Sequence, residues 1–163
     1  ALFDFGLVPL DAPRLHRTMD TMFHTLTVRT PVGGIARYED DYYHQVSRDL
    51  DNVPGNPWFI CTLWHAEWLI ATAKTERDLA AASRVIRWTH EHALKSGVFA
   101  EQVDPYTGEP LSVSPLAWSH ATYIKVVQEY LAKLAEFRAA HRPQDKTAQA
   151  DAELLQPLGR GSK

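Results

Sequence analysis

Four stretches of this chain repeat apolar residues at steps of three and four, the spacing that places side chains on one face of an α-helix. The spacing predicts helices over about residues 11–26, 56–73, 76–95 and 115–141. Pro13 stands near the start of the first segment, where a helix tolerates proline, and Gly97 is the expected stop of the third. No segment shows a convincing strand pattern, so the chain is predicted to be all-α.

Two long polar loops interrupt the helices, whereas the link at residues 74–77 is short. The first loop covers residues 30–57 and mixes glycine, proline and acidic residues with tyrosines. The second lies within FAEQVDPYTGEPLSVSPLAWSH, residues 99–120. Long loops in compact domains are commonly functional. If successive helices run antiparallel, both loops lie at the same end of the bundle, and we expect a site there.

Composition places the chain among globular proteins of one-domain size. Its 163 residues are 45% hydrophobic and 23% charged, and the net charge of −3 gives no reason to expect nucleic acid or an anionic membrane as a partner. The longest apolar run, residues 58–73, contains His65 and Glu67 and is therefore not a membrane span. Cys61 is the single cysteine, so no intrachain disulfide can form, and we expect it to be a small buried hydrophobe.

Glu101 and Arg37 are the candidate functional residues of the two loops. A lone glutamate in a loop is usually solvated, but Phe99 and Ala100 before it indicate partial burial, which is costly for a carboxylate without a partner or a function. Arg37 lies in IARYEDDYY, where it can pair with a neighbouring acidic residue or present a fork of donors to ligand hydroxyls. The residues leave these two alternatives open.

Trp58 and Trp118 stand at the start of the helices that follow the two loops, so both can lie at one rim. Flat indole faces beside carboxylates, arginine and tyrosine hydroxyls match the apolar faces and the hydroxyl fringe of a sugar ring. Metal binding is weakly supported, because His90 and His92 in HEH point to different faces of a helix. We therefore expect neither a metal nor another cofactor.

Ser119 and His120 are adjacent in the sequence, which does not make them a nucleophile and its base. We discount this pair as a catalytic site.

Three motifs together resemble the family-15 glycoside hydrolases, which include glucoamylases, glucodextranases and a group of trehalases. The motifs are GGIARYEDDYY at 33–43, GNPWFICTLWHAEW at 55–68, and the segment at 99–120 quoted above. The resemblance extends over about residues 2–137, in the order and spacing of the C-terminal part of that family. It implies an (α/α)6 barrel with the active site in a funnel at one end. It also implies inverting hydrolysis of α-glucosidic bonds, with release of β-glucose from non-reducing ends.

The same resemblance implies roles for individual residues. Glu101, in the AEQ motif, matches the family's catalytic base. Arg37 matches an arginine that contacts glucose hydroxyls, and Tyr42 lies in the same substrate-facing loop. Trp58 and Trp118 match aromatic residues that wall the terminal glucose subsites. No motif here decides among α-1,4-glucans, α-1,6-linked dextrans and trehalose as the substrate.

The family's general acid has no match in this chain. It lies in an earlier Trp-Glu-Glu type of motif, whereas Glu67 here belongs to an apolar helix and Glu39 to the arginine loop. We therefore interpret residues 1–141 as the C-terminal third of the catalytic barrel, a fragment of the enzyme, and residues 142–163 as a partly disordered tail. The alternative is a non-catalytic sugar-binding or scaffold module derived from the same fold.

The expected partners are an α-glucan or α-glucoside substrate and the N-terminal remainder of the same enzyme. A third of a barrel on its own should expose Trp64 and Trp68, so we expect the fragment to need that remainder or to self-associate as a homo-oligomer. No secretory signal is visible, but the chain begins at Ala1 without an initiator methionine. The compartment is therefore left open, with a preference for the cytoplasm.

Overall fold

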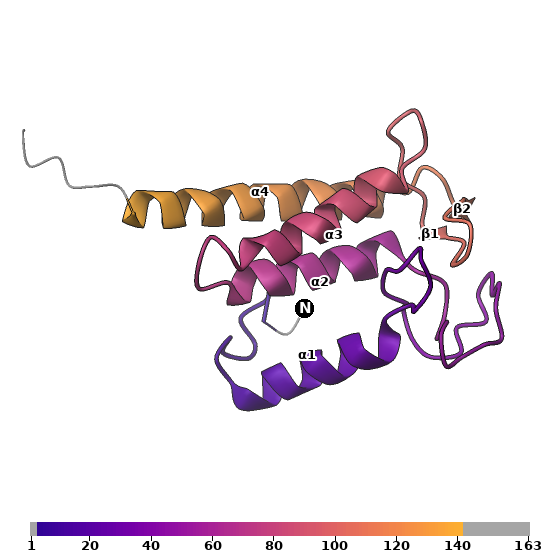
Figure 1. The fold of residues 1–163 in the computed structure, drawn as a ribbon, viewed down its shortest axis with the longest axis horizontal. Helices are drawn as coiled ribbons and strands as arrows, with labels where there is room; N and C mark the ends of the chain where they lie inside the picture. The colour runs from indigo at the N-terminus through magenta and orange to yellow at the C-terminus, as the bar shows by residue number, and fades with distance from the viewer. Residues whose placement is uncertain (1–2, 142–163) are drawn as a thin grey trace, which may run out of the picture.

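The computed structural model describes residues 3–141, so the predicted tail at 142–163 lies outside the described residues. The helices are α1 (Pro13–Leu26), α2 (Phe59–Thr72), α3 (Leu79–Glu91) and α4 (Ala117–Ala140), and the strands are β1 (Gln102–Val103) and β2 (Pro110–Leu111). Helix α2 lies between α1 on one side and α3 with α4 on the other, and the long loops gather at one end (Figure 1). No helix within residues 3–141 has both the length and the apolarity needed to cross a membrane.

The four predicted helices are present, but their ends differ from the expected ones. Helix α2 begins at Phe59 because Pro57 and Trp58 are extended and pair with other loop residues. Helix α3 begins later than expected because the Asp78 carboxylate accepts the backbone N–H groups of Lys74 and Thr75, at 3.0 and 2.9 Å, and closes a turn before the helix.

The prediction of no strand was wrong. Strands β1 and β2 form an antiparallel hairpin in which Gln102 pairs with Leu111 and Val103 pairs with Pro110. Each strand is only two residues long, which is too short to show the alternation of apolar and polar residues that marks a strand in a sequence.

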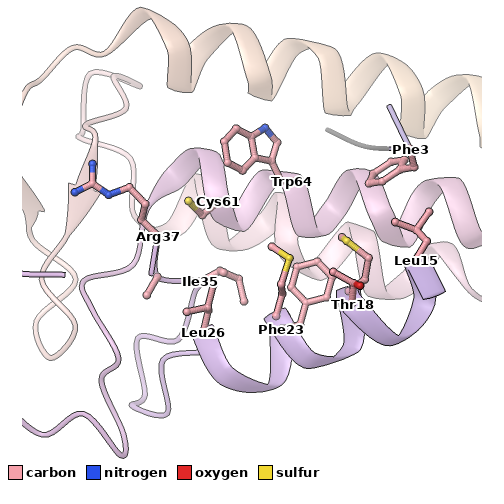
Figure 2. A pocket seen from close by; sticks show the side chains of 12 residues that line it. Phe3, Leu15, Thr18, Phe23, Leu26, Ile35, Arg37, Cys61 and Trp64 are labelled. Atoms are coloured by element: carbon pink, nitrogen blue, oxygen red, sulfur yellow. The ribbon is translucent and has the colours of Figure 1, made fainter. Parts of the chain in front are cut away.

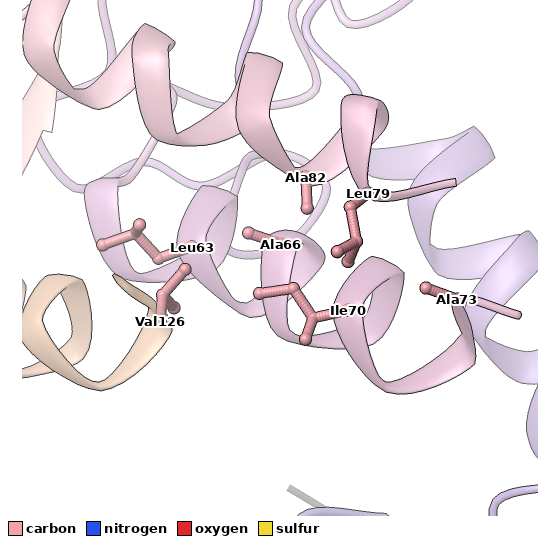
Figure 3. Packing of buried hydrophobic residues seen from close by; sticks show 7 residues of the cluster. All are labelled: Leu63, Ala66, Ile70, Ala73, Leu79, Ala82 and Val126. Carbon is pink, nitrogen blue, oxygen red and sulfur yellow. The ribbon is translucent and has the colours of Figure 1, made fainter. Parts of the chain in front are cut away.

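The main core lies where α2, α3 and α4 meet (Figure 3). Ala66 of α2 and Ala82 of α3 are fully buried, and these small side chains let the two helices approach closely. The buried residues of this core are Leu63, Ala66, Ile70, Ala73, Leu79, Ala82 and Val126. Leu63, Ala73, Leu79, Ala82 and Val126 are among the positions that the helical spacing predicts to be apolar, whereas Ala66 and Ile70 were not among them.

Helix α1 packs on the opposite side of α2 through larger side chains. Leu15 and Met19 of α1 cover Trp68, which is only 6% exposed, so the expectation that Trp68 would be exposed was wrong. Trp64, one turn earlier on α2, is 39% exposed as expected. The cover over Trp68 comes from the chain's own first helix, whose apolar face has no other helix to pack against within residues 3–141.

A cavity of about 220 Å³ lies between α1 and α2, with Arg37 at one end (Figure 2). Its walls are almost entirely apolar, and the thiol of Cys61 contributes to them. Burial raises the pKa of Cys61 to about 12, so this thiol stays protonated at neutral pH. Cys61 is therefore the inert buried hydrophobe that the sequence predicts.

Lys125 of α4 connects three carboxylates from different parts of the chain. Its Nζ lies 3.0 Å from Glu67 of α2, 2.9 Å from Asp4 and 2.8 Å from Glu129. Glu67 is 5% exposed, and burial raises its pKa although the ammonium beside it opposes the shift. Glu67 therefore has a structural partner in Lys125.

We predict that Lys125→Met destabilises the protein by about 1–3 kcal/mol at neutral pH, because it leaves the buried Glu67 carboxylate unpaired while Lys125 itself is partly solvated. Since the folded-state pKa of Glu67 is already raised, its neutral form is the one that folding favours. The difference in free energy of unfolding between variant and wild type should therefore shrink as the pH falls through that raised pKa. Urea unfolding at several pH values measures this difference. Lys133→Met, which removes the exposed pair with Glu136, should cost about 0.5 kcal/mol or less.

Candidate active site

The two long loops meet at one end of the helices, as the antiparallel arrangement predicts. The hydroxyl groups of Ser47 in the first loop and Tyr106 in the second lie 2.7 Å apart. Thr30 Oγ1 also donates to the carbonyl of Pro105. The sites suggested for each loop therefore form one region.

Short antiparallel pairings join the loops into what we call the strand patch. Thr27 pairs with Ile35, Ala36 with Pro57, and Trp58 with Gln102, and β1 then pairs with β2. The patch thus consists of Thr27, 35–36, 57–58, 102–103 and 110–111. Residues 57–58 lie in its middle and lead directly into α2, so the buried helix fixes the position of both loops.

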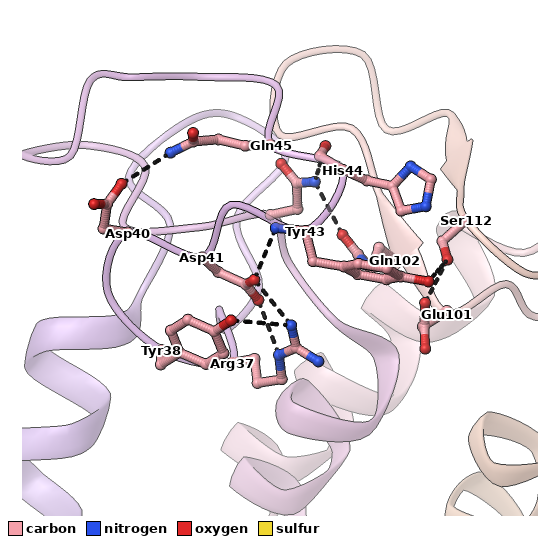
Figure 4. A network of polar contacts seen from close by, with 11 residues as sticks. Arg37, Tyr38, Asp40, Asp41, Tyr43, His44, Gln45, Glu101, Gln102 and Ser112 are labelled. Atoms are coloured by element: carbon pink, nitrogen blue, oxygen red, sulfur yellow. Dashed lines mark hydrogen bonds and ion pairs between the residues drawn. The ribbon is translucent and has the colours of Figure 1, made fainter.

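Glu101 is half-buried beside this patch, immediately before β1. Its backbone N–H donates to Val113 O at 2.9 Å, and its carbonyl accepts the N–H of Phe59 at 3.2 Å. Ser112 Oγ donates to Glu101 Oε2, and the Tyr43 hydroxyl lies 3.2 Å from Ser112 Oγ (Figure 4). Because Ser112 has one hydroxyl proton and directs it at Glu101, Tyr43 is the donor of the second bond. The carboxylate is thus held by a two-step hydroxyl relay from the other loop.

Arg37 forms an ion pair with Asp41, one of the two alternatives open from the sequence. Its Nε and Nη2 each lie 2.9 Å from an Asp41 oxygen, and Asp41 is 1% exposed. The hydrogen bond to Asp41 raises the pKa of Arg37 above its ordinary value, so the guanidinium stays charged. Nη1 of Arg37 makes no hydrogen bond within residues 3–141, so the ion pair does not use the whole fork.

Trp58 lies beneath Arg37, with the guanidinium carbon 4.2 Å from the ring centroid. Trp58 is 3% exposed, so one indole face is covered by Arg37 and is not open in this structure. The ring of Tyr43 lies 6.2 Å from Trp58 and 5.5 Å from the same guanidinium carbon. Arg37, Tyr43, Trp58 and Glu101 therefore form one contiguous group.

Trp118 and Tyr42 lie outside that group of contacts. Trp118, in the first turn of α4, is 54% exposed and packs edge to face against Trp64, with ring centroids 5.8 Å apart. Tyr42 is 80% exposed, and its side chain makes no hydrogen bond within the described residues. The roles of both in sugar binding stay predictions.

Asn56 and Gln102 form a buried polar link between the loops. Asn56 Nδ2 donates to Gln102 Oε1 at 2.9 Å and to His44 O at 2.7 Å. Two other buried donors, Trp58 Nε1 and Gln102 Nε2, have no hydrogen-bond partner within residues 3–141. Buried N–H groups require a hydrogen-bond acceptor, so a water molecule or another part of the protein should accept from each of these two donors.

Sequence reasoning missed Tyr43 and Ser112, whereas Asp41 was among the acidic neighbours considered as an ion-pair partner of Arg37. A backbone signal accompanies this region: Ser112 has φ of 63° and His44 has φ of 55°, an uncommon conformation for residues other than glycine. Backbone strain of this kind is frequent at functional sites, but a single sequence does not indicate where it occurs. Among residues 3–141 no group of three His, Cys, Asp or Glu side chains is placed to hold a metal ion.

The chain is similar in sequence to a known family and in structure to a solved enzyme. The family described as Glycosyl hydrolases family 15 matches residues 71–128. An uncharacterized glycosyl hydrolase of Methanocaldococcus jannaschii is 29% identical over 136 residues, covering 78% of this chain and 20% of that protein. The crystal structure of a bacterial glucoamylase complexed with acarbose superposes with a TM-score of 0.67 at 28% identity, covering 81% of this chain. The resemblance to the family-15 glycosyl hydrolases is confirmed.

The chain forms an all-α part of the (α/α)6 barrel found in family-15 glycosyl hydrolases, to which the two-residue strands are a small addition. It spans only 20% of the length of the archaeal relative and 19% of the bacterial glucoamylase. The family match at 71–128 includes Glu101 and Trp118, while Arg37, Tyr42 and Trp58 precede it.

Gly34 tests how closely the first loop packs against Pro57 and against Trp88 of α3. At φ of 89°, an added Cβ would lie 2.7 Å from Pro57 Cβ and 2.8 Å from Trp88 Cζ2, whereas at Gly33 (φ 70°) it would meet nothing within 4 Å. We predict that Gly33→Ala costs about 1 kcal/mol for backbone strain alone. Gly34→Ala should cost about 1–3 kcal/mol more, because the overpacked strand patch must shift. Thermal unfolding of the two variants measures the difference, and equal losses would contradict the predicted steric contact.

Proposed function

We propose that this chain supplies the catalytic base, Glu101, and part of the sugar pocket of an inverting, exo-acting α-glucoside hydrolase. In this proposal the complete enzyme releases β-glucose from non-reducing ends. The observation that carries it is the state of the Glu101 carboxylate, which is half-buried but forms no ion pair within residues 3–141. One oxygen, Oε2, accepts the Ser112 hydroxyl, and Oε1 accepts no hydrogen bond within the same residues. A general base needs such an oxygen to take the proton of the attacking water.

The chemistry of inversion requires two carboxyl groups on opposite faces of the sugar ring. The base deprotonates water while the acid protonates the leaving oxygen, and the two stand roughly 6.5–9.5 Å apart to admit that water. Ser112 and Tyr43 would fix the Glu101 carboxylate, so that little motion is needed when the proton is transferred. Nη1 of Arg37 would donate to a sugar hydroxyl while Asp41 holds the rest of the guanidinium.

The comparisons support an α-glucoside as the ligand. The bacterial glucoamylase was solved in complex with acarbose, and this chain covers 19% of it at 28% identity. Trp58 and Trp118 are proposed to wall the terminal glucose subsites, with Tyr42 in the same substrate-facing loop. Trp118 already presents an exposed indole face, while Trp58 would contact sugar only where Arg37 leaves its ring uncovered.

The general acid is proposed to lie in another part of the complete enzyme, with residues 1–141 forming the C-terminal third of its barrel. Two aspartates of the first loop have partners: Asp41 binds Arg37, and Asp40 accepts a hydrogen bond from Gln45 Nε2 at 3.2 Å (Figure 4). Exposed apolar residues agree with a missing neighbour, since Ile124 and Leu131 on α4 are each 56% exposed.

The first prediction from this proposal is that purified residues 1–163 release no glucose from maltose, isomaltose or trehalose. The chain would lack the acid that protonates the leaving oxygen. Adding the full-length protein to the same assay is the positive control. Glucose release by the fragment alone, at a rate above that of heat-treated fragment, would show that the acid is present in this chain.

The second prediction concerns the base in the full-length protein. Glu101→Gln should lower kcat by about a thousandfold or more, because an amide cannot take a proton from water, while KM and folding stay nearly unchanged. Glu109→Gln makes the same chemical change at an exposed position of the same hairpin and should leave kcat unaltered. NMR of the fresh product should show β-glucose. Near-normal kcat in Glu101→Gln, or an α-anomer from the wild-type enzyme, would refute the assigned role.

A further inference from the structure

The backbone just before Glu101 is held by the N-cap residue and the first turn of α4. Leu116 N–H donates to Phe99 O at 3.0 Å, and Ser119 Oγ donates to Ala100 O at 2.9 Å. His120 completes the set, because its Nε2 lies 3.1 Å from the backbone N of Phe99. Ser119 and His120, discounted above as a nucleophile and base, thus both bind the segment that carries the carboxylate.

The bond to His120 fixes the chemical state of its ring. A backbone N–H can only donate, so Nε2 must carry a lone pair and the ring is neutral, with its proton on Nδ1. The imidazole also stacks on the Phe99 ring, with centroids 4.7 Å apart and an angle of 27° between the planes. One side chain therefore binds both the backbone and the ring of Phe99, two residues before Glu101.

The partners of Phe99 make this contact relevant to the carboxylate. Phe99 and Ala100 are 4% and 1% exposed, and Phe99 packs against Phe59 with centroids 5.4 Å apart. Phe59 N–H in turn binds the carbonyl of Glu101. A shift of Phe99 would therefore reach Glu101 both along the chain and through Phe59.

We propose that His120 is a positioning residue for Glu101, acting as the neutral hydrogen-bond acceptor that fixes the Phe99 amide. This inference rests on the proposed role of Glu101 as the base, and it assigns His120 no contact with substrate. It predicts that the position of Glu101 depends on a hydrogen-bond acceptor within reach of the Phe99 amide, and depends less on the imidazole ring that provides it.

The test uses three substitutions of His120 in the full-length protein. His120→Leu removes the acceptor, His120→Asn keeps an amide that is too short to reach, and His120→Gln places an amide oxygen near the position of Nε2. The matched control is His141→Leu, at the far end of α4, where Nδ1 lies near Phe137 O. The measurements are kcat and KM with an α-glucoside, and crystal structures of the variants that show the position of the Glu101 carboxylate.

We expect kcat to fall about tenfold to a hundredfold in His120→Leu and His120→Asn, because a misplacement of about 1 Å can cost that much. KM should stay within about twofold, and His120→Gln should recover most of the rate, while His141→Leu keeps it all. Unchanged kcat in His120→Leu, or His120→Gln as slow as His120→Asn, would overturn the proposal. If His120→Leu does not fold, the Asn and Gln variants decide alone.

The same variants distinguish a failure of this inference from a failure of the proposed function. If the wild-type full-length protein hydrolyses no α-glucoside, the proposed function is wrong, and the crystal structures then decide the positioning role. A displaced Glu101 carboxylate in His120→Asn but not in His120→Gln supports it. A carboxylate that stays in place in both variants overturns it.

Discussion

The backbone pairing at the start of α2 is the constraint on which the rest of the structure depends. Trp58 N–H binds Ile35 O at 2.9 Å, Phe59 N–H binds Glu101 O at 3.2 Å, and Val103 N–H binds Pro57 O at 3.0 Å. These bonds join two parts of the chain that are distant in sequence, Ile35 and residues 101–103, to the start of one buried helix. Without these bonds the two long loops would lie on the surface independently of each other, and Arg37 and Glu101 would have no fixed distance or orientation. The helices are rigid, and the strand patch attaches the two loops to them, so the residues of the site keep a defined geometry.

Burial of polar groups explains why this end of the molecule has a single arrangement. Asp41, Asn56 and Gln102 are each at most 2% exposed, so each must find its partners inside the protein. Asp41 forms an ion pair with Arg37, and Asn56 donates hydrogen bonds to Gln102 and to the carbonyl of His44. A slip of either loop would leave one of these groups unpaired, at a cost of about 1–3 kcal/mol each. The polar residues therefore specify how the loops meet, while the apolar core specifies only how the helices pack.

The sequence was sufficient for the helices and for the meeting of the two loops, because both follow from local rules. Periodic apolar positions such as Leu63 and Leu79 face the core, and antiparallel helices bring alternate connections to the same end. The strands and the burial of Trp68 could not be predicted from the sequence, since both result from contacts between residues far apart in the chain. For the site, motifs indicated Arg37 and Glu101 correctly as neighbours in one region. Ser112 and Tyr43 had no local signal, because their relevance arises only when the loops meet.

The environment of Glu101 also shows how a protein can keep a carboxylate available. A nearby cation would stabilise its charge but would occupy an oxygen that the proposed role as a base requires to be free. Here Arg37, the cation closest to the group in this network, is neutralised by Asp41, and Glu101 is oriented instead by a serine hydroxyl and by its backbone. Hydroxyl and backbone bonds fix the direction of the carboxylate without placing a cation against its oxygens. The ion pair of Arg37 and Asp41 is therefore part of the same arrangement as the Glu101 carboxylate, with which neither residue forms a hydrogen bond.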